Sequence, residues 1–179
     1  VTHKYHACCH GIHATIEALV KIKNQNNITP ENVKKIEILI HKQYLNVCNI
    51  QKPRSGLEAK FSYKLVAALV MKNYDTAKIN TFSDTICYDN ELIKLRNLVE
   101  INTSEKISET AAEVKITTQN NTVFSSSYDL KDLRDINEKE KKMENKTRSL
   151  LGEQNSNFLW NSLKVDKILP SKWLEKYNE

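Results

Sequence analysis

The spacing of apolar side chains near the start of the chain changes from a helical period to a strand period. Apolar residues first recur at nearly helical intervals, which predicts a helix over residues 13–24. Over residues 33–41 they alternate instead, with Ile36, Ile38 and Ile40 on one face and charged side chains on the other. This second pattern predicts a strand in a sheet that exposes one of its sides.

Two more helices are predicted downstream of this strand. One runs over residues 57–72, and its apolar positions, which include Leu57 and Leu65, are expected to be buried against the sheet. Asp89 can cap the other helix, which continues to Leu98 with an apolar stripe along one side.

The segments that follow complete a small sheet. Residues 99–102 read as a strand, and residues 113–118 and 122–127 flank three polar residues that tolerate left-handed turns, which predicts a β-hairpin. Helices and strands together indicate an α+β fold. We therefore predict a two-layer domain over residues 1–128, with helices packed on a small, mostly antiparallel sheet.

The character of the sequence changes after Tyr128. Residues 129–148 are nearly all charged or polar, which is typical of an exposed helix or a linker. We assign residues 129–179 to a charged linker and a helical tail, and expect residues 155–177 to bind a helical partner or to self-associate, because their apolar side chains need a partner surface. These apolar side chains are Phe158, Trp160, Leu163, Val165, Ile168, Leu169 and Trp173.

Composition limits the classes of function. The formal net charge of the 179 residues is +5, and acidic residues interrupt the densest basic run, at residues 139–142, which argues against nucleic-acid binding. No apolar run reaches the roughly eighteen residues that cross a membrane, and no secretory signal is visible. The four cysteines form no spaced disulfide framework, so we expect reduced thiols and a cytoplasmic protein, or a mitochondrial matrix protein if a targeting segment precedes it.

The N-terminal segment concentrates the chemically capable groups. Residues 3–13 contain four histidines, two adjacent cysteines and a lysine, and such groups gather where an anion or a metal ion is held. Zinc sites usually combine two pairs of ligands with about two to four residues between partners. Only one cluster occurs here and no Cys-x-x-Cys pair, so we expect no metal and no other cofactor. A small metal-binding protein stays open as an alternative.

Two segments, one at the N-terminus and one around residue 60, match the motifs of one family. Lys4, Cys9 and His13 precede Ile16-Glu17-Ala18, and Ala59-Lys60-Phe61-Ser62 opens a helix rich in alanine and valine. In this order and spacing they resemble the MmgE/PrpD family, which includes 2-methylcitrate dehydratase, cis-aconitate decarboxylase and an iminodisuccinate epimerase. The resemblance implies the smaller, lid-like domain of that family.

The resemblance covers residues 4–125 and implies a function. Members of the family remove a proton next to a carboxylate of a small di- or tricarboxylate, and then lose water, lose carbon dioxide or return the proton to the opposite face. Lys4 and His13 are the implied catalytic residues, and Lys4, His13, Cys9 and Ser62 the implied substrate-binding residues. An ammonium group can hold a carboxylate, and His13 starts a helix, where the positive end of the dipole favours anions. Read without the resemblance, Lys4 also fits an ordinary surface lysine and His13 a core histidine.

The resemblance also implies partners. In the family the chain returns to a large helical domain that carries the proton-abstracting residues, and this chain lacks the N-terminal part of it. We therefore expect the N-terminal helical domain and a small carboxylate as partners and no activity of this chain alone, with homodimerisation left open.

One departure from the family pattern stands out. Leu65 stands where several members carry a substrate-facing tyrosine, and Tyr63 lies about 200° away on a helix. Leucine cannot donate a hydrogen bond or a proton. A noncatalytic fragment or decayed homologue that serves as an interaction module is therefore the second alternative.

Overall fold

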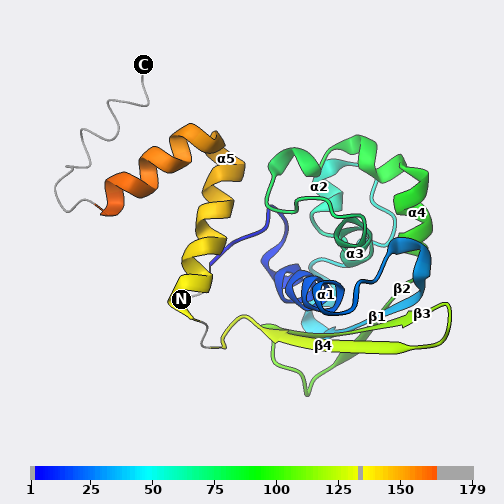
Figure 1. The fold of residues 1–179 in the computed structure, drawn as a ribbon. Helices are drawn as coiled ribbons and strands as arrows, with labels where there is room; N and C mark the ends of the chain where they lie inside the picture. Colours follow the sequence, from blue (N-terminus) through cyan, green and yellow to red (C-terminus); the bar gives the residue numbers. More distant parts are fainter. Residues whose placement is uncertain (1–2, 133–134, 165–179) are drawn as a thin grey trace. The chain divides into compact units, whose positions relative to one another are not determined.

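The computed structural model of the chain describes residues 3–132 and 135–164. The chain divides into two compact units, one up to residue 134 and one from residue 135 onward. The first unit is an α+β domain with helices on a four-stranded sheet, as predicted (Figure 1). Among the described residues, no helix combines the length and the apolar character needed to cross a membrane.

The sheet has the strand order β2-β1-β3-β4. Strand β1 (Val33–His41) pairs in parallel with β2 (Val99–Ser104) and antiparallel with β3 (Ala111–Thr118), and β3 pairs antiparallel with β4 (Val123–Asp129). A parallel pair needs a long crossover, and the helices between β1 and β2 provide it. The predicted strands, the hairpin and the mostly antiparallel sheet are thus confirmed.

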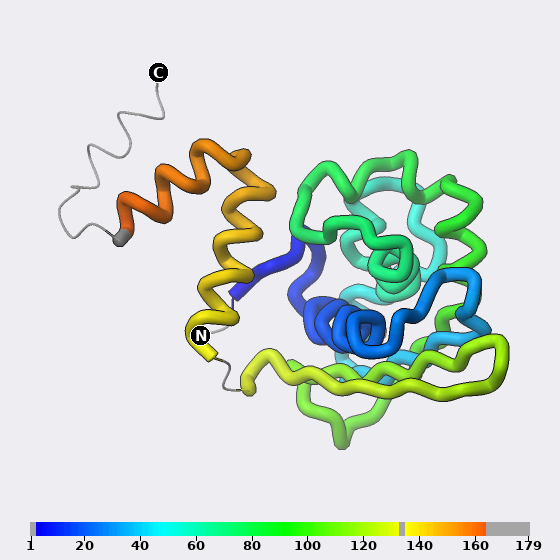
Figure 2. Tube along the Cα trace, in the orientation of Figure 1, coloured from blue at the N-terminus to red at the C-terminus, as the bar shows by residue number. Residues whose placement is uncertain are grey.

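The alternation predicted for β1 decides which side of the sheet is covered. Ile36, Ile38 and Ile40 are buried, and in β3 Val114 and Ile116 are buried beside them. Helices α1 (His13–Asn26) and α3 (Tyr63–Met71) lie over this side, and the close course of α1 along β3 and β4 is visible in Figures 1 and 2. The core therefore forms between one helical layer and one face of the sheet.

Helix α1 begins at the predicted residue and ends two residues later than predicted. Its end is marked by Asn27, which adopts a left-handed conformation with φ of 50° and donates its backbone N–H to the Lys23 carbonyl. Helix α4 (Asn90–Asn97) begins as predicted, because the Asp89 carboxylate accepts hydrogen bonds from two backbone N–H groups of the first turn.

The prediction of a single helix over residues 57–72 is wrong. The structure has two helices, α2 (Gly56–Ala59) and α3, separated by a non-helical break. The backbone N–H groups of Cys9 and Ile50 donate to carbonyls within this break, which draws those carbonyls away from helical hydrogen bonds. Leu57, predicted to be buried, is 68% exposed, because the short α2 turns it to the surface.

Five short 3₁₀ turns connect these elements in the described part of the chain. They are η1 (His10–Ile12), η2 (Pro30–Asn32), η3 (Lys42–Leu45), η4 (Ile79–Thr81) and η5 (Asp84–Tyr88).

The second unit contains the long helix α5 (Ile136–Lys164), which is bent at Gly152, where φ is 77°. Within it, the Trp160 indole donates to the Thr147 hydroxyl at 2.8 Å, and Leu163 is exposed. The predicted helical tail is thus helical as far as residue 164. Four apolar tail residues on which the partner prediction depends lie outside the described residues: Val165, Ile168, Leu169 and Trp173.

Lys23 ties the end of α3 to α1. Its ammonium donates to the carbonyls of Val70 and Met71 at 2.7 and 3.1 Å and to Asn73 Oδ1 at 2.6 Å. A cation at a helix C-terminus also complements the helix dipole. We expect Lys23→Met to lower the free energy of unfolding by about 1 kcal/mol, measured by urea denaturation. Lys21→Met, at an exposed position of the same helix, is the control, and equal loss in both variants would contradict the bridging role.

Candidate functional site

The N-terminal segment that carries the histidines is fixed to the domain by backbone hydrogen bonds. The N–H of Ala7 donates to the Thr76 carbonyl at 2.8 Å, and the N–H of Cys9 donates to the Lys60 carbonyl at 2.9 Å. The 3₁₀ turn η1 then delivers the chain into α1 at His13. These contacts gather side chains from three distant parts of the sequence around the start of α1.

His13 is the centre of this cluster. Its side chain is completely buried, and the rings of His6 and His10 each lie with their centroids 4.8 Å from its own. Among the described residues, neither ring nitrogen of His13 makes a well-formed hydrogen bond, although the backbone of Cys8 interacts weakly with the ring, and Nε2 of His10 has no hydrogen-bond partner. Buried polar atoms without well-formed hydrogen bonds are rare in folded proteins, so core packing alone does not explain these nitrogens.

His6 is held by a network that the sequence did not reveal. One ring nitrogen lies 2.8 Å from the Thr76 hydroxyl, and the other lies 3.3 Å from a carboxylate oxygen of Glu17. Glu17 is buried one turn after His13 on α1. The network fixes the orientation of the His6 ring, which packs against the His13 ring.

The electrostatics of the cluster keep its central histidine neutral. Burial lowers the pKa of His13 to about 2, and the nearby His6, His10 and Lys4 act in the same direction, while the backbone of Cys8 opposes them weakly. Burial and Lys4 also lower the pKa of His10. A neutral imidazole can donate a hydrogen bond from one nitrogen and accept one at the other, which suits it to hydrogen bonding rather than to proton transfer near neutral pH.

Lys4 and Cys9 lie at the same end of the domain. Lys4 is exposed, and its charge reaches His13, His10 and Cys9, whose pKa values it lowers. The Cys48 side chain donates a hydrogen bond to the Cys9 sulfur, which is the main reason that the pKa of Cys9 falls to about 6 despite partial burial. The structure therefore brings three predicted site residues, Lys4, Cys9 and His13, together.

Ser62 has a local structural task. Its side chain is completely buried, and its hydroxyl accepts the backbone N–H of Leu65 at 3.2 Å, which caps α3. Leu65 is also fully buried. The neighbouring Tyr63 donates a hydrogen bond from its hydroxyl to the Gly11 carbonyl at 2.9 Å and so supports the turn that leads to His13.

The histidine cluster has no metal-binding geometry. Among the described residues, no group of three or more histidine, cysteine, aspartate or glutamate side chains could hold a metal ion. The arrangement instead suits a small anion, because it combines a lysine charge, hydrogen-bonding imidazoles and the N-terminal end of α1.

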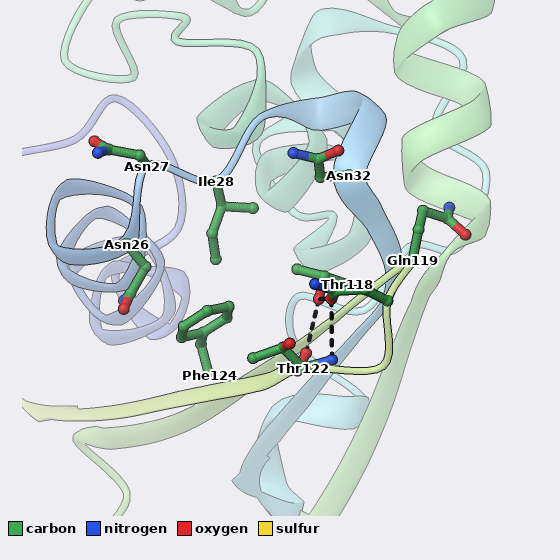
Figure 3. A pocket seen from close by; sticks show the side chains of 9 residues that line it. Asn26, Asn27, Ile28, Asn32, Thr118, Gln119, Thr122 and Phe124 are labelled. Atoms are coloured by element: carbon green, nitrogen blue, oxygen red, sulfur yellow. Dashed lines mark hydrogen bonds between the residues drawn. The ribbon is translucent and has the colours of Figure 1, made fainter.

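A separate hollow of about 290 Å³ lies between the end of α1 and the β3–β4 turn (Figure 3). Its lining contains no titratable side chain. Several of its polar groups already serve the fold: Thr118 pairs with Thr122 across the turn, and the Gln119 amide donates to the Val33 carbonyl. This hollow therefore offers polar contacts but no acid, base or charge.

Two comparisons bear on identity. No curated protein matches the chain. The family model described as the MmgE/PrpD C-terminal domain matches residues 6–157, a span that contains Cys9, His13 and Ser62 and begins just after Lys4. Because this match covers most of the 179 residues, the chain belongs to the MmgE/PrpD family and carries its C-terminal domain.

Proposed function

We propose that this chain supplies the substrate-covering domain of an MmgE/PrpD-type enzyme that removes a proton next to a carboxylate of a small di- or tricarboxylate. The observation that carries the proposal is His13, a fully buried imidazole at the start of α1 whose ring nitrogens make no well-formed hydrogen bond and interact only weakly with the backbone of Cys8. A purely structural histidine in a core normally finds hydrogen-bond partners. An imidazole that binds a ligand instead keeps its ring nitrogens available for hydrogen bonds to that ligand.

The charges around His13 fit such a substrate. As the proton leaves the carbon, negative charge builds on the adjacent carboxylate, and groups already placed to receive that charge lower the barrier. Lys4 attracts the carboxylate, and the neutral His13 donates a hydrogen bond to it, which stabilises the negative charge as it develops. Cys9 and Ser62 complete the proposed substrate-binding set.

The base that takes the proton belongs, in this proposal, to the N-terminal helical domain of the family. That domain would close over the N-terminal cluster and partner the nitrogens of His10 and His13 together with the substrate. Groups of that domain would also decide whether the reaction ends with loss of water, with loss of carbon dioxide or with return of the proton to the opposite face. All four cysteines of the chain are thiols, which fits a reducing compartment such as the cytoplasm or the mitochondrial matrix.

The test pairs the chain with a helical domain of the family and measures turnover with 2-methylcitrate, cis-aconitate and iminodisuccinate. We expect Lys4→Met to reduce kcat at least ~10-fold on the substrate that turns over, because it removes stabilisation of about 1.4 kcal/mol or more from the developing charge. The chain without the helical domain is expected to show no turnover.

Lys52→Met, which removes an exposed lysine outside the N-terminal cluster, serves as the matched control. Equal kinetics of the Lys4→Met and Lys52→Met variants would remove Lys4 from the mechanism. Tight binding of the helical domain without turnover of any of the three substrates would favour the alternative, an interaction module without catalysis.

A further inference from the structure

Backbone segments that are far apart in the sequence meet beside the N-terminal cluster. The N–H of Cys9 donates to the Lys60 carbonyl at 2.9 Å, and the N–H of Ile50 donates to the Phe61 carbonyl at 2.9 Å. An isolated antiparallel bridge strengthens the second contact. The adjacent carbonyls of Lys60 and Phe61 thus place the backbone of Cys9 close to that of Ile50, two residues after Cys48.

The side chains at this junction are in close contact. The Cys48 thiol is completely buried, and it donates a hydrogen bond to the sulfur of Cys9, which is partly exposed. A Cβ placed on Gly11 would lie 2.5 Å from Tyr44 Cε1 and 3.2 Å from Cys48 Sγ, so the turn at Gly11 packs directly against both side chains. One sulfur that reagents can reach therefore touches a second sulfur that is shielded.

The two sulfurs differ in reactivity. The hydrogen bond from Cys48 lowers the pKa of Cys9, which increases its thiolate fraction at neutral pH, and the thiolate is the nucleophilic form of cysteine. The hydrogen bond to Cys9 and burial raise the pKa of Cys48, which keeps its proton. Burial also raises the pKa of Cys87, whose thiol donates to the Ser55 carbonyl at 3.4 Å.

We propose that Cys9 and Cys48 form a peroxide-reactive pair, in which Cys9 is oxidised first and Cys48 then closes an intramolecular disulfide. A reactive thiolate next to a resolving thiol is the arrangement that oxidation-sensitive cysteines share. The role goes beyond the proposed catalysis, which needs no second thiol.

The oxidant is hydrogen peroxide, and the chemistry has two steps. The Cys9 thiolate attacks one peroxide oxygen, the O–O bond breaks, and the released hydroxide takes a proton from solvent to become water. The Cys48 sulfur then attacks the sulfur of the Cys9 sulfenic acid. The S–S bond forms as the S–O bond breaks, and the departing hydroxyl leaves as water with the Cys48 proton. Two thiols are oxidised and one peroxide is reduced to two waters.

The experiment treats the full, reduced chain with a small excess of hydrogen peroxide at neutral pH. Remaining thiols are then blocked with a maleimide, and the protein is digested without reduction for mass spectrometry. We expect a peptide pair joined through Cys9 and Cys48. In a separate alkylation series, Cys9 should react with iodoacetamide at least ~10-fold faster than Cys87 at pH 7, and the midpoint of its pH profile should lie below that of an ordinary thiol.

Three variants decide the assignment. Cys48→Ser should stop the reaction at a Cys9 sulfenic acid that dimedone traps, and Cys9→Ser should abolish the cross-link. Cys8→Ser should retain the cross-link, because the buried Cys8 thiol points instead to the Cys9 carbonyl. A cross-link lost in Cys8→Ser, or Cys9 oxidised beyond the sulfenic acid with Cys48 still alkylatable after unfolding, would overturn the proposal.

Discussion

Replacing His13 with asparagine is expected to reduce kcat of the chain paired with its helical domain by about 10²–10³-fold, the range typical for loss of a hydrogen-bond donor to the charge that develops in the transition state. Asparagine is close to histidine in shape at its inner half but is shorter, so it has no donor at the position of the histidine Nε2. The measurement is steady-state turnover on the substrate found to react. KM is expected to change less than kcat, because the interaction strengthens as charge develops.

The control for this prediction separates chemistry from packing. His41→Asn changes a half-buried histidine at the end of β1 and is expected to leave turnover unchanged. Circular dichroism and thermal melting of His13→Asn establish that the variant is folded. A folded variant with normal kcat would show that His13 is only a core residue, the alternative that the sequence left open.

The strands were predictable because their signal is local. The alternation of Ile36, Ile38 and Ile40 needs only neighbouring residues, and the same is true of the β3–β4 hairpin and of the Asp89 cap. The break between α2 and α3 is a different case. It depends on backbone N–H groups from Cys9 and Ile50, and no pattern within residues 57–72 indicates that these distant groups will donate hydrogen bonds there.

The candidate site shows the same division. Lys4, Cys9 and His13 were found because they stand close together in a recognisable order. The partners that orient them come from elsewhere: Thr76 reaches the His6 ring, and Cys48 reaches Cys9. Such contacts are created by the fold, so a single sequence carries no signal for them beyond the residue types themselves.

The last prediction concerns the stability of the chain in acid. His13 has a pKa of about 2 in the folded state and an ordinary value of 6.5 when exposed. Between these two pH values the unfolded state therefore binds a proton at His13 and the folded state does not. The contribution of the neutral His13 to the free energy of unfolding is therefore fully present above about pH 6.5, and it is lost as the pH decreases toward 2. Relative to pH 7.5, we expect the free energy of unfolding at pH 5 to be lower by about 2 kcal/mol from His13 alone. The lowered pKa of His10 adds to the loss in the same direction.

Urea denaturation of the full chain at pH 7.5 and 5 measures this difference, and a His13→Leu variant identifies its source. Leucine occupies the buried site without a titratable group, so the variant should lose much less stability between these two pH values, even though its stability at pH 7.5 can differ from that of the parent. The carboxylates shared by both proteins contribute equally and cancel in the comparison. An unchanged pH dependence in His13→Leu would mean that His13 is hydrated or protonated in the folded chain. It would then remove the neutral imidazole on which the proposed function depends.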